Sequence, residues 1–104
     1  MTLEIDYLRE TLDAVSFRKM CEILRDDIQS LSSEVASSFA ANDFVSAFKR
    51  IHALKGVFAS IGQQTSTQWC DRVRSESRQD VDALKSELAV ETELALAQIG
   101  RWLS

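Results

Sequence analysis

The sequence predicts an all-α fold, an antiparallel four-helix bundle preceded by a short N-terminal lead-in helix. The 104-residue chain has no proline and only three glycines, so little in it interrupts a helix. Hydrophobic residues recur every three or four positions along several stretches, which is the spacing of an amphipathic helix. No stretch alternates in the manner of a strand. A chain of this length builds one modest core, so we expect a single domain over residues 1–104.

The first half of the chain contains two of the expected helices. The lead-in helix is expected over residues 3–12, where the apolar spacing is irregular. A long amphipathic helix is expected over residues 15–40, with Asp13 or Ser16 as its N-cap. One face of this long helix is apolar and consists of Phe17, Met20, Cys21, Leu24, Ile28, Leu31, Val35 and Phe39.

Three more helices are expected in the second half. Asn42 or Asp43 caps a helix that reaches position 61 and ends at Gly62. Residues 63–66 are polar, and the helix that follows has a sparse apolar face of Trp69, Cys70 and Val73. Residues 75–80 predict a turn, with Asp80 as the cap of a last helix over 81–102.

Composition excludes several classes of function. With 12 basic and 16 acidic residues, the chain lacks the positive field that attracts nucleic acid. No run of about 18 apolar residues is present, and the first residues are acidic and do not resemble a signal peptide, so we expect a cytoplasmic protein. Cys21 and Cys70 fall in apolar helical registers and predict two small buried side chains rather than a disulfide. One histidine and two distant cysteines make a metal site improbable, and we expect none.

The segment from His52 to Gly62 carries the candidate site. His52 is the only histidine in the chain, and its imidazole can act as a nucleophile near neutral pH. On a helix, Lys55 and Gly56 lie one turn from His52. At about 100° per residue, His52 falls on the flank of the apolar stripe, together with Val45, Gly56 and Ala59. Taken alone, such a histidine is most often a surface residue without a role.

The same segment resembles the signature of histidine-containing phosphotransfer (HPt) domains. The likeness rests on the run His-Ala-Leu-Lys-Gly at residues 52–56, and extends to Gly62, to the Ala-Asn-Asp-Phe turn at residues 41–44 and to Cys70. It covers residues 15–103 approximately. The resemblance implies a four-helix bundle that accepts a phosphoryl group on one histidine from a receiver-domain aspartate and passes it to another receiver. Such a domain is a phosphocarrier and not an enzyme.

The resemblance also implies roles for individual residues. His52 would be the phosphorylated residue, and Lys55 would neutralise part of the phosphoryl charge. Gly56 would let the partner's active site approach, although a tight helix–helix contact is an alternative reason for a glycine there. Lys49, Val57 and Ala59 are our candidates for docking the partner. No cofactor is expected in the chain itself, because the partner receiver supplies the magnesium ion and the catalytic residues.

Partners are expected to be receiver domains of response regulators or of a hybrid histidine kinase, and we expect a monomer. An alternative is a module that binds a receiver or another signalling enzyme without being phosphorylated. The chain departs from the family pattern at five positions. Val57 and Phe58 stand where small residues are common, Gln63 where alanine is usual, and Ser66 where leucine is expected. Arg74 stands near a position often occupied by glutamate. A positive rim near His52 is a further possibility, and scattered solvated charges are its alternative. The rim would comprise Lys49, Arg50, Arg72, Arg74 and Arg78.

Overall fold

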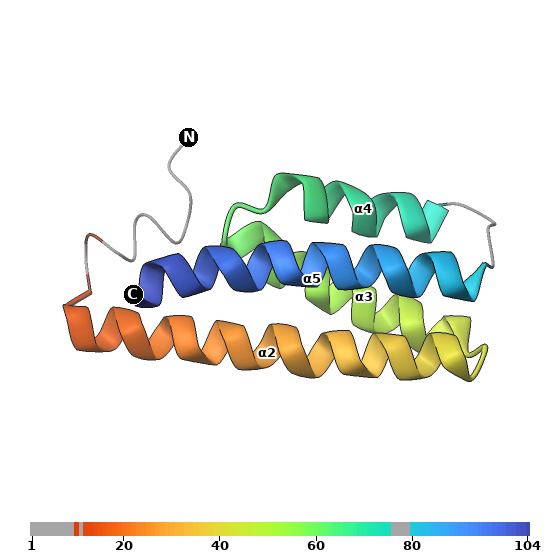
Figure 1. Cartoon of the computed structure of the whole chain (residues 1–104), viewed down its shortest axis with the longest axis horizontal. Coiled ribbons are helices and arrows are strands. Elements are labelled where there is room, and N and C mark those ends of the chain that lie inside the picture. The colour runs from red at the N-terminus through yellow and green to blue at the C-terminus, as the bar shows by residue number, and fades with distance from the viewer. Residues whose placement is uncertain (1–9, 11, 76–79) are drawn as a thin grey trace.

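The computed structural model describes residue 10, residues 12–75 and residues 80–104. Within them lie four helices, α2 (Ala14–Ala40), α3 (Phe44–Ser60), α4 (Gln64–Ser75) and α5 (Val81–Leu103). They form an antiparallel bundle in which the chain runs alternately in opposite directions (Figure 1). The predicted all-α fold is therefore confirmed. The lead-in helix expected over residues 3–12 lies outside the described residues, apart from Glu10 and Leu12.

Three of the four helices, α2, α3 and α5, have an aspartate as N-cap, and the structure decides between the caps that the sequence left open. Asp13 accepts a hydrogen bond from the Ser16 amide at 2.7 Å, so Asp13 is the cap of α2 and Ser16 is the donor. Asp43 accepts from the Ser46 amide at 3.1 Å at the start of α3. Asp80 caps α5 as expected, at 3.1 Å from the Ala83 amide. Each carboxylate satisfies an amide that the first turn leaves without a helical partner.

The turns that follow α2 and α3 share one geometry. Asn42 has a φ of 56° and Gly62 a φ of 74°, the left-handed conformation that commonly ends a helix. After α3, the Gln63 amide bonds the Phe58 carbonyl at 2.9 Å, which is the long-range bond of a Schellman motif. Because Asn42 takes the left-handed position, Asp43 is free to cap α3. Both links are short, so α3 lies antiparallel to α2 and to α4.

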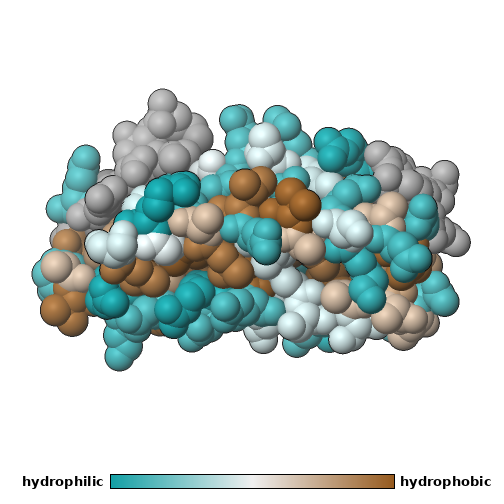
Figure 2. Space-filling model, in the orientation of Figure 1, coloured by the Kyte–Doolittle hydropathy of each residue, from teal (hydrophilic) through white to brown (hydrophobic). Residues whose placement is uncertain are grey.

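A single apolar core runs between the helices. α2 packs against α3 and α5, while α4 packs mainly against α3 and more lightly against α5. Fully buried side chains include Ile28 from α2, Ile51 and Phe58 from α3, and Ile99 from α5. Hydrophobic residues also reach the surface over α5 in the view of Figure 2, and this helix carries exposed Val90 and Leu94. Long helices with continuous apolar faces thus provide most of the scaffold.

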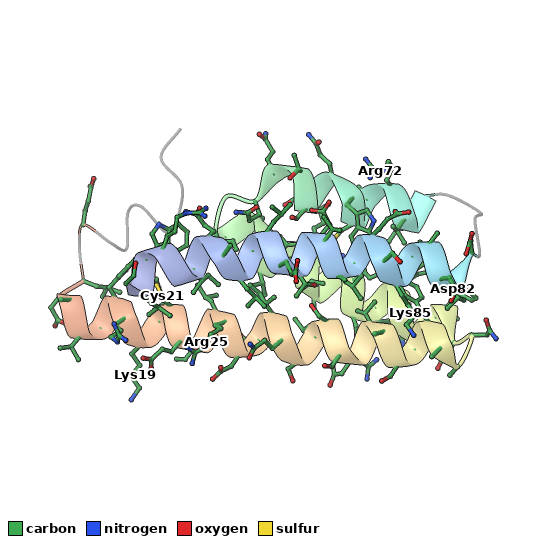
Figure 3. The ribbon with its side chains drawn as sticks, in the orientation of Figure 1. Lys19, Cys21, Arg25, Arg72, Asp82 and Lys85 are labelled. Carbon is green, nitrogen blue, oxygen red and sulfur yellow. The ribbon has the colours of Figure 1, made fainter. Side chains whose placement is uncertain are left out.

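Both cysteines are free and buried, as the sequence predicted. Cys21 points inward from α2 (Figure 3), and Cys70 is buried on α4. Burial raises the pKa of the Cys70 thiol to about 12, with the negative charges of Asp71 and Glu91 adding to the effect. A thiol with so high a pKa is not a thiolate at neutral pH, so Cys70 is a packing residue.

Candidate functional site on α3 and α4

The only histidine of the chain lies in the middle of α3 and is exposed. Its neighbours Ile51 and Leu54 are fully buried, so the helix turns the imidazole about 100° away from the core. Val45, Gly56 and Ala59 are exposed along the same flank, as the helical register predicted. The flank therefore presents His52 on a smooth surface without large side chains immediately C-terminal to it.

Arg74 of α4 reaches the imidazole directly. Its Nη1 lies 3.0 Å from Nδ1 of His52. A guanidinium has donors and no acceptor, so Nδ1 must accept this hydrogen bond. A neutral imidazole carries one ring proton, which the contact therefore assigns to Nε2. From the sequence we included Arg74 in a possible rim of cations, but its bond to the imidazole was not foreseen.

An open groove lies beside His52, between α3 and the end of α4. Val45, Phe48 and Lys49 line it together with His52 and Arg74. Its walls combine apolar surface with two cations, Lys49 and Arg74, in a chain whose formal charge is −4. Positive charge in a local concave surface attracts anionic groups even when the whole protein is acidic.

Lys55 is held by a partner on α4. Its Nζ lies 2.6 Å from Oδ1 of Asp71, and both side chains remain partly exposed, at 33% and 56%. This ion pair bridges α3 and α4 one helical turn from the His52–Arg74 contact. Lys55 thus has a competing anion within reach, which the sequence did not reveal. Its role in neutralising a phosphoryl group remains a prediction.

Gly56 is exposed, and a Cβ atom built on it would meet nothing within 4 Å. A tight helix–helix contact inside the bundle therefore does not explain this glycine. Glycine in a helix costs about 1 kcal/mol relative to alanine. The open space above Gly56 is compatible with the close approach of a partner, which remains a prediction.

Two expectations about the surroundings of His52 need correction. Val57 is half-buried and packs against the core, because α3 packs against both α2 and α4 and so buries a wider arc than one apolar stripe. It offers a partner less surface than we expected, whereas Lys49 and Ala59 are exposed. The rim of five cations is also wrong in part. Arg50 points to α2, where it pairs with Glu34 at 3.2 Å.

Arg72, Arg74 and Arg78 are the other arginines of the predicted rim. Arg72 projects from α4 away from the bundle (Figure 3), and it is Arg74 that reaches the imidazole. Arg78 lies outside the described residues. The cations that surround His52 in the described part of the chain are therefore Lys49, Lys55 and Arg74, from two helices.

The residue expected to be leucine, Ser66, is buried on α4 and donates a hydrogen bond to Glu91 at 2.6 Å. Trp69, on the same side of α4, donates from Nε1 to Glu87 at 2.9 Å. α4 is therefore fastened to α5 partly by polar contacts, and these hold the helix that positions Arg74.

The described residues hold neither a metal-binding cluster nor a helix that could span a membrane. Among them, no group of three or more histidine, cysteine, aspartate or glutamate side chains has the arrangement of a metal site. Across the same residues, every helix is too short or too polar to cross a lipid bilayer.

Comparison with known proteins identifies one family. The family model described as "Hpt domain" matches residues 17–102, which is most of the chain. Searches of curated proteins and of solved structures gave no significant match. The matched region includes all of α3 and α4, and therefore the entire His52 site.

Proposed function

The chain belongs to the Hpt domain family, and from that premise we propose that His52 carries a phosphoryl group between receiver domains. Hpt domains are phosphotransfer modules of phosphorelays that interact with receiver domains, and they are phosphocarriers rather than catalysts. The finer proposal concerns the residue and its direction of exchange. His52 accepts the group from an aspartyl phosphate on one receiver and passes it to an aspartate on another.

One observation carries the proposal: an exposed imidazole in the middle of α3 has cations from two helices around it. A neutral imidazole nitrogen is a suitable nucleophile at cellular pH. Phosphoryl transfer depends on positioning and on neutralising the oxygens of the transferred group, which Lys49 and Lys55 are suited to do. The exposed Gly56 and Ala59 leave room for a second protein at this flank.

The transfer itself requires one bond to form and one to break. A lone pair of an imidazole nitrogen attacks phosphorus and forms the N–P bond. The P–O bond of the aspartyl phosphate breaks, and its electron pair stays on the aspartate as a carboxylate. The ring then gives its remaining proton to solvent, which leaves a phosphoramidate with a neutral ring and an anionic phosphoryl group. Delivery to the second receiver reverses these changes. We propose that the receiver brings the magnesium ion that assists each step.

The proposal is tested by incubating the protein with phosphorylated receiver domains. We expect the protein to gain phosphate that is labile in acid and stable in base, as a phosphohistidine is. Because the chain has a single histidine, His52→Gln must abolish the labelling. The variant should keep the far-ultraviolet circular dichroism of the parent, since His52 is exposed. Labelling that persists in His52→Gln, or no labelling across a full panel of receivers, would contradict the proposal.

The alternative function, binding without phosphorylation, would be favoured by exposed apolar side chains at Val57 and Phe58. Phe58 is fully buried and Val57 packs against the core, so neither supplies such a surface. Receiver binding that survives His52→Ala, with no phosphate transferred by the parent protein, would select this alternative.

A further inference from the structure

The contact between Arg74 and His52 has chemical consequences of its own, and the inference drawn from them rests on the proposed function of His52. We propose that Arg74 is a positioning residue that fixes the tautomer of His52 before transfer and protects the phosphohistidine after it. The geometry is the 3.0 Å contact from Nη1 of Arg74 to Nδ1 of His52. Since Arg74 only donates, the lone pair of Nδ1 is occupied and the ring proton resides on Nε2.

The contact also selects the nitrogen that meets the partner. Nδ1 faces Arg74 on α4, and Nε2 lies on the opposite edge of the ring. Among the described residues, none makes a hydrogen bond to Nε2. Nε2 is therefore the nitrogen that an approaching receiver meets, and the proposed role of Arg74 takes Nε2 as the phosphorylated nitrogen.

Before transfer, this tautomer keeps His52 unreactive. A nitrogen that bears the ring proton has no in-plane lone pair with which to attack phosphorus. For Nε2 to react, its proton must leave and Nδ1 must carry one instead, which requires Arg74 to withdraw. An incoming anionic phosphoryl group gives the Arg74 guanidinium an alternative partner. Activation of His52 is thereby coupled to the arrival of the phosphoryl donor.

After transfer, the same contact fits the product. In Nε2-phosphohistidine the N–P bond occupies Nε2, and Nδ1 keeps its lone pair, so Nδ1 again accepts from Arg74. Loss of the phosphoryl group to water breaks the N–P bond and leaves its electron pair on Nε2. The ring then leaves as neutral imidazole only if Nδ1 has gained a proton. Arg74 and that proton compete for one lone pair, so Arg74 slows the loss.

The other charged groups of the site do not offset this effect. On α3, Lys49 adds positive charge, and Lys55 is paired with Asp71 of α4. On α2, Glu34 pairs with Arg50, which points away from the groove. On α5, Glu91 accepts from Ser66 and Glu87 accepts from Trp69. In the described part of the chain, no carboxylate therefore bonds Nδ1 and favours a proton there.

The tautomer is measured first, by ¹⁵N NMR of the imidazole nitrogens in the unphosphorylated protein. We expect a proton-bearing Nε2 and a proton-free Nδ1 in the parent. Arg74→Glu should reverse the tautomer, because a carboxylate accepts from Nδ1–H. Arg72→Glu makes the same change of charge two residues away and should leave the tautomer as it is. A parent with the proton on Nδ1, or an Arg74→Glu variant with unchanged nitrogen shifts, would overturn the inference.

The lifetime of the phosphohistidine is measured second. Potassium phosphoramidate loads the histidine chemically without any receiver, and phosphate release is followed at neutral pH after the reagent is removed. We expect Arg74→Ala to lose its phosphate about fivefold faster than the parent, the scale of one exposed charged contact. Arg72→Ala should match the parent. Equal lifetimes of the parent and Arg74→Ala would overturn the protective role.

The two proposals fail in distinguishable ways. If receivers never label His52 although phosphoramidate does, the proposed function fails while the lifetimes and tautomers still test Arg74. If receivers label His52 and the Arg74→Ala lifetime equals that of the parent, the role of Arg74 fails alone.

Discussion

The two sides of the bundle are held together in different ways. α2 and α5 are long helices that join mainly through continuous apolar faces, with fully buried residues such as Ile28 and Ile99. The polar contacts between them have uncharged acceptors: the Ser32 and Thr92 hydroxyls lie 2.9 Å apart, and Arg18 donates to the Leu103 carbonyl at 2.8 Å. α3 and α4 also share a core, and two polar pairs that include side-chain cations bridge them at the surface, Lys55–Asp71 and His52–Arg74. A buried apolar side chain has no other partner to move to, whereas Lys55 can exchange the Asp71 carboxylate for another anion. If His52 is phosphorylated as proposed, we therefore expect the Lys55–Asp71 pair to respond more readily than the packed faces of α2 and α5.

The largest expected effect comes from truncating a buried side chain of α2. Phe39, fully buried on α2, has its ring centroid 6.0 Å from that of Phe44 at the start of α3. We expect Phe39→Ala to lower the free energy of unfolding by about 3 to 5 kcal/mol, because the substitution leaves a cavity. Urea denaturation measures the change. The folded fraction of the variant should still accept phosphate on His52.

Ile23→Ala is the matched control for this prediction. Ile23 is also an apolar residue of α2, but it is 54% exposed. Its truncation removes little buried surface and should change the free energy of unfolding far less. Similar losses in Phe39→Ala and Ile23→Ala would show that the core of α2 is not what stabilises the fold.

The sequence predicted the long helix α2 and the end of α3 well. Residues 15–40 were expected to form a helix, and α2 covers Ala14–Ala40. The apolar repeat is long there, so a shift of register would expose the whole stripe. Gly62 was likewise expected at the end of α3, because a left-handed residue after a helix favours glycine. Such features depend on neighbours close in sequence and can be read from it.

The surroundings of His52 depend on contacts between α3 and α4. Spacing along the sequence does not determine such contacts. His52 was proposed as the site because residue types and spacing within α3 point to it, and its role stays a prediction. Its bond to Arg74 depends on the rotation and axial offset of α4 against α3, and these follow from packing the whole core. The same holds for Lys55 and Asp71. The partial burial of Val57 was not foreseen because it depends on two neighbouring helices, and its role in docking stays a prediction.

Breaking the ion pair of Lys55 with Asp71, which bridges α3 and α4, should have a smaller effect on stability than truncating Phe39. We expect Lys55→Ala to slow phosphoryl transfer and to lower the free energy of unfolding by at most about 1 kcal/mol, since the pair is exposed. Stopped-flow transfer from a phosphorylated receiver and thermal melts supply the two measurements. A large loss of stability would instead make Lys55 a structural residue.

Asp71→Asn is the control for this prediction, because it breaks the same ion pair and leaves the lysine in place. Its stability should fall as little as that of Lys55→Ala, but its transfer rate should equal or exceed that of the parent, since Lys55 is released toward His52. Equal slowing in the two variants would mean that the ion pair, and not the lysine charge, serves the transfer.

The smallest expected effect is on the melting temperature in acid, and it concerns Asp13 and Asp43, the N-caps of α2 and α3. Hydrogen bonds from Ser16 hold the pKa of Asp13 below the ordinary value of 3.8. Those from Ser46 do the same to the pKa of Asp43, with smaller help from the charges of Arg50 and Lys49. A carboxyl whose pKa is lower in the folded state stabilises the fold at pH values above 3.8, and this stabilisation is lost as the pH falls through the folded value.

Asparagine is an equally good N-cap but does not titrate. We therefore expect Asp13→Asn and Asp43→Asn each to melt near the parent temperature at neutral pH, and to lose less of that temperature than the parent does on acidification. Added salt screens the cations near Asp43, so it should shrink the difference between parent and variant at Asp43 more than at Asp13. A variant at either position that loses as much on acidification as the parent would show that the cap carboxylate does not set its acid response. An identical effect of salt at both positions would show that the charges of Arg50 and Lys49 do not affect Asp43 of α3 more than Asp13 of α2 is affected by charge.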